Sequence, residues 1–182
     1  MQENQKLSQN KRGKRFLTIR EVVLFAMLGT IMFISKLVMD ALPNIHLVGM
    51  LTMAYTVVYR GKALIPIYVF VLLTGLYAGF SPWWVPYLYA WAVLWAATML
   101  LPRKMSKKIA QFIYPAVCCL HGLLFGVLCA PVLIFLLNYT VEQAIIMGVA
   151  FDIVHAVGNL VAGILVLPMS GLLFRLEARA KR

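Results

Sequence analysis

Charged residues are scarce in this chain of 182 residues: they make up 13% of it, and only six are acidic. Hydrophobic residues make up 63%, and the mean hydropathy is +0.87. A soluble globular domain carries about 25% charged residues. The shortage of charge therefore excludes an ordinary soluble domain and predicts an all-α integral membrane protein with a single domain.

Cysteines and catalytic motifs are also few. Cys118, Cys119 and Cys129 fall in one apolar segment, where a thiol behaves as a small hydrophobe, so no disulfide framework is expected. The chain has no HExxH, no GxSxG and no glycine-rich phosphate loop. Cys118 and His121 have helical spacing, but without a third ligand a helix–helix hydrogen bond is favoured over a metal site. We therefore expect no enzyme, no cofactor and no metal.

Apolar runs dominate what is present. About 20 apolar residues are needed for a helix to cross a hydrocarbon layer of about 30 Å. Six runs approach or exceed that length: 19–39, 46–60, 63–80, 84–101, 109–137 and 145–174. The sequence thus predicts six transmembrane helices in a domain of residues 19–175, between basic cytoplasmic tails at 1–18 and 176–182.

Lys and Arg are concentrated in alternate connectors. The segments MQENQKLSQNKRGKRF, YRGK, PRKMSKK and RLEARAKR are basic, whereas DALPN, SPWW and NYTVEQ contain neither residue. Because Lys and Arg favour the cytoplasmic side, both termini are expected inside a multi-pass protein of the bacterial plasma membrane. The net charge of +11 then reflects topology in a lipid bilayer, and nucleic acid is not an expected partner.

The segment FDIVHAVGN places three polar side chains in an apolar run: Asp152, His155 and Asn159. On a helix they fall within about 60° of one another. A carboxylate at the centre of a bilayer costs about 2.5–3.5 kcal/mol, so it is a candidate functional group. The alternative is a clamp between helices, in which Asp152 pairs with His155 or Lys36 and Asn159 bonds a backbone carbonyl.

Aromatic residues gather in the segment SPWWVPYLYAW. Four rings share one helical face that descends from the connector: Trp84, Tyr87, Trp91 and Trp95. Such a stripe suits the stacking of a flat conjugated ligand, and ordinary helix packing is the alternative. Trp83 is assigned to the aromatic belt at the membrane interface.

Polar residues in the connectors that lack Lys and Arg complete the candidate site. Asn44 and His46 precede the second apolar run, and Asn138 follows the fifth. Their position suits a lid over a pocket, although loop solvation alone would explain each of them. The predicted substrate-binding set is therefore Asp152, His155, Asn159, Trp84, Tyr87, Trp91, Asn138, His46 and Asn44.

The six runs, the small pair Ala26 and Thr30 in the first of them, and the final FDIVHAVGNLVAGILVLP resemble the substrate-binding S components of energy-coupling factor (ECF) transporters. The resemblance implies a six-helix subunit that captures a vitamin or related micronutrient from outside. It also implies assembly with a membrane-embedded coupling (T) subunit and two ATPase subunits. Ala26 and Thr30 stand where the coupling subunit is contacted, with Thr in place of the usual Ala.

The cargo remains open at this level. The acid favours a ligand with a hydrogen-bond donor or positive charge, and the rings favour an aromatic ligand: thiamin or its pyrimidine precursor, a pteridine, a flavin, a deazaguanine base or a corrin. An alternative function is a stand-alone secondary transporter in which Asp152 and His155 relay protons.

Overall fold

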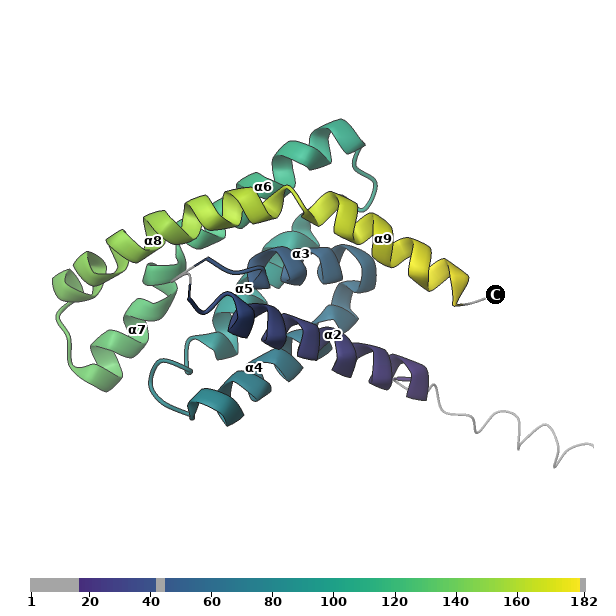
Figure 1. The fold of residues 1–182 in the computed structure, drawn as a ribbon. Helices are drawn as coiled ribbons and strands as arrows, with labels where there is room; N and C mark the ends of the chain where they lie inside the picture. The colour runs from purple at the N-terminus through teal and green to yellow at the C-terminus, as the bar shows by residue number, and fades with distance from the viewer. Residues whose placement is uncertain (1–16, 42–44, 181–182) are drawn as a thin grey trace, which may run out of the picture.

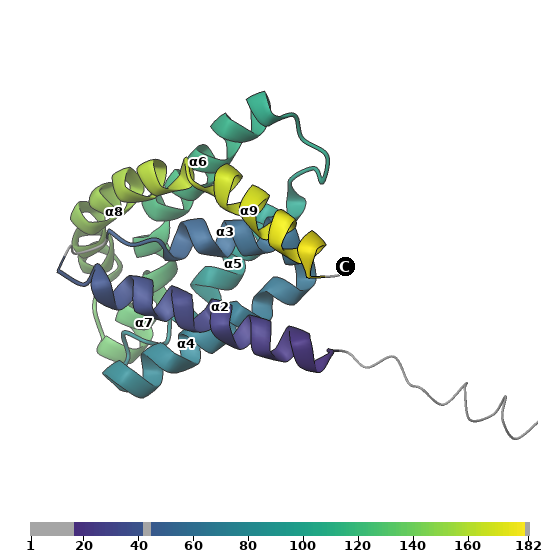
Figure 2. The same ribbon diagram turned by 45° about the vertical axis from the view of Figure 1, so that its right-hand side comes forward.

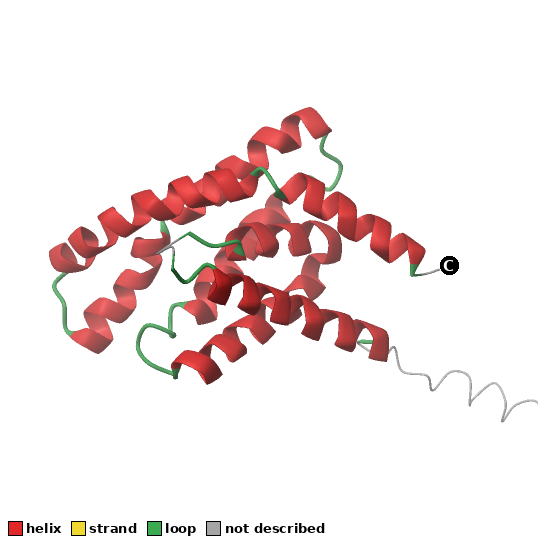
Figure 3. Cartoon of the chain, in the orientation of Figure 1, coloured by secondary structure: helices red, strands yellow, loops and turns green. Residues whose placement is uncertain are grey.

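The computed structural model describes residues 17–41 and 45–180, and every regular element in those ranges is helical (Figure 1, Figure 3). The elements are α2 (Ile19–Val38), α3 (Val48–Tyr59), the 3-10 helix η1 (Arg60–Ala63), α4 (Leu64–Ala78), α5 (Tyr87–Leu100), α6 (Lys107–Leu123), α7 (Phe125–Leu137), α8 (Val141–Gly163) and α9 (Val166–Arg179). The prediction of an all-α chain is confirmed.

Three helical stretches are long and apolar enough to cross a membrane: Ile19–Val38, Val48–Ala78 and Lys107–Leu137. A fourth is added if Val141–Val149 and Phe151–Gly163, which meet at 42°, form one bent span. The helix α5 is apolar but has only 14 residues. Apolar helices of this length indicate a membrane-embedded protein with three or four candidate spans, and the predicted number of six is not established by length.

Some predicted boundaries move because local chemistry ends or begins a helix elsewhere. Thr140 caps α8, since its side chain accepts a hydrogen bond from the Gln143 backbone N–H, so this helix starts before the predicted position 145. The run 145–174 holds two helices, α8 and α9, and α9 continues to Arg179 beyond the predicted end of the domain at 175. The run 109–137 is divided at Leu124 into α6 and α7.

Arg60 reverses the direction of the chain. Its backbone has φ 55° and ψ −124°, and its N–H donates to the Thr56 carbonyl at the end of α3. This conformation cannot continue an α-helix. In both views α4 leaves the turn in the direction opposite to α3 and lies beside α2 (Figure 1, Figure 2).

The helix α3 forms the centre of the bundle. Residues 48–56 are all buried, and α3 packs against α2, α5, α6, α8 and α9. This segment contains no charged residue, so it can be surrounded on every side without leaving a charge unpaired. The outer helices instead expose large apolar side chains such as Met27, Phe135 and Val161, as expected where lipid is the solvent.

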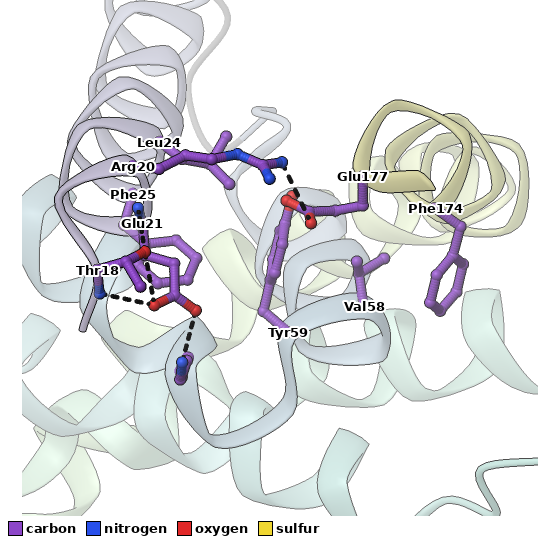
Figure 4. A pocket seen from close by; sticks show the side chains of 10 residues that line it. Thr18, Arg20, Glu21, Leu24, Phe25, Val58, Tyr59, Phe174 and Glu177 are labelled. Atoms are coloured by element: carbon purple, nitrogen blue, oxygen red, sulfur yellow. Dashed lines mark hydrogen bonds and ion pairs between the residues drawn. The ribbon is translucent and has the colours of Figure 1, made fainter. Parts of the chain in front are cut away.

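The first and last described helices meet at one end of the molecule. Arg20 of α2 and Glu177 of α9 point toward each other (Figure 4) and form an ion pair of 3.6 Å. Arg20 also donates to the Ala180 carbonyl at 3.0 Å. Glu21 pairs with Lys62 of η1 at 2.5 Å. These contacts bring two of the predicted basic segments, YRGK and RLEARAKR, to the start of α2, and this end of the molecule is termed the basic end below.

Candidate functional site

A cavity of about 270 Å³ lies at the opposite end, between α7, α8 and the start of α5. The rings of Trp83, Tyr87 and Phe125 line it, and Asp152 and His155 are its principal polar members. Two glycines, Gly126 and Gly148, and several apolar side chains complete the wall. Of the described residues that line this cavity, Asp152 alone is charged, so it gives a largely apolar space one strong acceptor.

Asp152 joins α8 to the first turn of α7. Its Oδ1 accepts a hydrogen bond of 2.7 Å from the Gly126 backbone N–H. This donor is available because the break at Leu124 starts a new helix, and the first N–H groups of a helix have no partner within it. A carboxylate is stabilised in that position by the helix dipole. Thus Oδ1 is used to fasten the two helices together.

The second oxygen of Asp152 is left for the cavity. Among the described residues no donor bonds Oδ2, and a side chain on Gly126 would overlap it. The predicted alternative partners do not bond Asp152: no hydrogen bond joins it to His155, and Lys36 pairs with Asp40 at 3.5 Å. Oδ1 therefore holds two helices together, although with a partner other than the predicted His155 or Lys36. A contact between Oδ2 and a ligand stays a prediction.

The three histidines of the chain come together behind the cavity. The ring of His46, from the connector before α3, lies 4.9 Å from the ring of His155 and 5.7 Å from that of Trp91. Phe125 lies 4.7 Å from His155, and His121 lies 5.6 Å from Trp91. In the described part of the chain no three His, Cys, Asp or Glu residues are arranged to hold a metal ion.

His121 makes the interaction that the sequence favoured. Its Nε2 lies 3.0 Å from the Ala90 carbonyl, which joins α6 to α5. A proton on Nε2 makes this contact a hydrogen bond in which the imidazole donates. His121 is thus a structural residue that supports the ring cluster.

Several buried polar atoms near the histidines have no hydrogen-bond partner. Among the described residues they are Nδ1 of His46, Nδ1 of His121, Nε2 of His155, Nε1 of Trp91 and both amide atoms of Asn159. Asn159 is 1% exposed and does not bond a backbone carbonyl, which was one predicted alternative. An unpaired buried polar group costs about 1–3 kcal/mol. Of these residues only His155 lines the cavity, so its Nε2 is the one atom of this group whose residue borders that space.

Asn159 lies deeper than the cavity. A Cβ atom added to Gly49 of α3 would stand 3.1 Å from its Oδ1 and 3.2 Å from Cys118 Sγ. The amide therefore points at the central helix, and it does not line the cavity with Asp152 and His155. The predicted polar triplet does share one face of α8, but at two depths.

The rings predicted to form one aromatic stripe lie in different surroundings. Tyr87 lines the cavity, Trp91 is fully buried behind Phe125, and Trp84 instead donates its Nε1 to the Val71 carbonyl at 2.8 Å. Trp83 is predicted for the interface belt, but it lines the cavity, and Trp84 does not. The reason is local: residues 82–86 form turns and α5 begins only at Tyr87, so helical spacing does not apply to residue 84.

The predicted lid residues are dispersed. His46 joins the ring cluster, and Asn44 lies outside the described residues. Asn138 is exposed and ends α7 in a left-handed conformation, φ 57°, which Asn tolerates better than most residues. Phe125 and Cys129 were missed in the sequence, because treating 109–137 as one continuous helix hid the break that turns them toward α8.

Ala26 and Thr30 lie on the exposed face of α2. The Thr30 hydroxyl donates to the Ala26 carbonyl at 2.9 Å, so it presents no unpaired polar group to lipid or to another helix. Thr therefore acts here as a small residue, as Ala would.

No protein-family model, curated protein or solved structure matches this chain.

Proposed function

We propose that this chain is a membrane-embedded binding subunit that captures an organic micronutrient and delivers it for ATP-driven uptake by an ECF-type importer. One observation carries the proposal: a ring-lined cavity with a single carboxylate, Asp152, lies at the end opposite the basic end. If the basic end is cytoplasmic, as the distribution of Lys and Arg predicts, the cavity is loaded from outside.

The dimensions of the cavity favour a small ligand. A volume of about 270 Å³ lies near the lower end of the range of about 300–1,000 Å³ that is usual for small-molecule pockets. A ligand with one or two rings fits this space, whereas a corrin is far too large. The rings of Tyr87 and Phe125 offer stacking surfaces, and Asp152 Oδ2 accepts a hydrogen bond from an N–H group. A pyrimidine such as the thiamin precursor, or a deazaguanine base, meets these requirements.

Two features of the remaining chain agree with an even number of crossings and with a membrane partner. The turn at Arg60 divides Val48–Ala78 into two antiparallel helices, and the described termini lie at one end, as an even number of crossings requires. The exposed face of α2 that carries Ala26 and Thr30 is open to a coupling subunit. Small residues allow such close approach of helices within lipid.

Native thiols provide a direct test. Cys129 lines the cavity, whereas Cys119 is similarly half-buried on α6 but does not line it. We expect a bound ligand to slow alkylation of Cys129 by up to about 100-fold at about 100 times its Kd, and to leave Cys119 unaffected. Purified protein would be alkylated with and without each candidate compound, and the modified peptides quantified by mass spectrometry. Native mass spectrometry of the purified chain would identify a retained ligand.

Equal protection of both thiols would indicate general stabilisation and would argue against this cavity. Protection of neither thiol by any one- or two-ring compound, together with the absence of a retained ligand, would refute a high-affinity binding subunit.

A secondary proton-coupled carrier is the second candidate, because Asp152 and His155 line one cavity. In vesicles that contain only this chain, such a carrier would accumulate substrate when a pH gradient is imposed. We expect no accumulation without the ATPase and coupling subunits, and gradient-driven uptake by the chain alone would establish the carrier instead.

A further inference from the structure

A second crevice, of about 230 Å³, lies at the basic end and is separate from the ligand cavity. It is bounded by α3, the connector between α5 and α6, and α9, and its polar lining includes Arg60, Arg103, Thr98 and Tyr114. Among the residues that the structure describes, none that lines it is acidic. Within this part of the chain, two guanidinium groups thus share a small crevice without a carboxylate to neutralise them.

Arg60 occupies this crevice at a conformational cost. Its φ of 55° and ψ of −124° are those of the first central residue of a type II′ turn, a position that glycine adopts without strain. The next residue is Gly61, so of the two central residues of the turn Arg60 alone carries a side chain. Strained residues of this kind are concentrated at functional sites.

The guanidinium of Arg60 is only partly used within the protein. Its Nη2 donates to the Met99 carbonyl at 2.8 Å, which fixes the side chain across the end of α5. Its Nε is buried and has no hydrogen-bond partner. Arg103 forms no ion pair within the described residues, so both arginines have donors available for an anion.

We propose that this crevice binds a phosphate group, supplied by the headgroup of an anionic phospholipid. Arginine pairs are suited to phosphate because their N–H groups form charge-assisted hydrogen bonds in a fixed fork. Basic crevices between membrane helices on the cytoplasmic side hold such headgroups. The neighbouring helix ends expose Leu100, Ile109 and Phe112, which supply an apolar surface for acyl chains.

The test measures the unfolding temperature of the purified full chain in detergent, titrated with phosphatidylglycerol. Phosphatidylcholine, glycerol phosphate and inorganic phosphate are titrated in parallel. We expect phosphatidylglycerol to raise the unfolding temperature most, and the apparent lipid affinity to fall about tenfold in Arg103→Gln, because one charge-assisted bond is lost. Arg175→Gln, which removes an exposed arginine of α9 that does not line the crevice, is the matched control.

Arg60→Gly distinguishes a loss of lipid binding from a loss of stability. Glycine accepts the turn conformation, so this variant is expected to unfold at an unchanged or higher temperature and yet to lose the stabilisation by phosphatidylglycerol. Equal lipid affinity in wild type, Arg103→Gln and Arg60→Gly would overturn the site. An equal response to glycerol phosphate or inorganic phosphate would overturn the lipid source and assign the crevice to a soluble phosphate compound. None of these outcomes depends on which micronutrient fills the other cavity.

Discussion

Asp152→Asn is expected to weaken ligand binding by about 10- to 100-fold while the protein remains folded. The amide oxygen of Asn can still accept the hydrogen bond from the Gly126 N–H, which now spans 2.7 Å to Oδ1. The substitution removes the negative charge that the cavity offers through Oδ2. A hydrogen bond to a charged group contributes about 1.5–3 kcal/mol, which sets the size of the expected loss. Isothermal titration calorimetry with the retained ligand measures it.

Two further substitutions separate the functions of the two oxygens. Asp152→Ala removes both, so it is expected to lower the unfolding temperature as well as the affinity. Glu142→Gln is the matched control, since this carboxylate is exposed on the first turn of the same helix and does not line the cavity. If Asp152→Asn binds ligand as tightly as wild type and Glu142→Gln does, the carboxylate serves only to fasten α7 to α8.

Gly122→Ala is expected to lower the free energy of unfolding by about 1–3 kcal/mol, as overpacking does. A Cβ atom at this position would stand 2.8 Å from Ala156 Cα and 2.9 Å from the His155 carbonyl carbon. Both atoms belong to the backbone of α8, so no side-chain rotation can make room for the methyl group. The helices would have to separate, and ligand affinity would fall because His155 lines the cavity.

Gly171→Ala is the control, because it is expected to raise the free energy of unfolding where Gly122→Ala lowers it. Gly171 lies inside α9, and an added Cβ atom there would meet nothing within 4 Å. Replacing glycine by alanine in the interior of a helix is expected to stabilise by about 0.5–1 kcal/mol. Reversible unfolding in detergent, followed by circular dichroism, compares the two variants. Equal effects of the same sign at both positions would show that α6 and α8 are not in close contact at Gly122.

The sequence by itself determined the class of the protein and the position of its principal acid. Hydropathy predicts membrane helices because burial in lipid depends on composition over a whole segment. A lone carboxylate in such a segment is costly wherever it lies, which identified Asp152 before any contact was known. The helical spacing of His155 and Asn159 correctly placed them on the same face as Asp152, since α8 has no interruption between those residues.

Only the tertiary structure decided which side chains meet. Helical spacing was misleading for Trp84, because the turns at 82–86 precede α5, and the break at Leu124 placed Phe125 and Gly126 against α8. Asp152 Oδ1 accepts a hydrogen bond from an N–H group that lies 26 positions away in the sequence, and no helical spacing could have predicted that partner. Likewise, the opposing arginines at the basic end come from different connectors. Such contacts are set by how helix backbones approach one another, and that approach depends on glycines and helix breaks acting across the whole bundle.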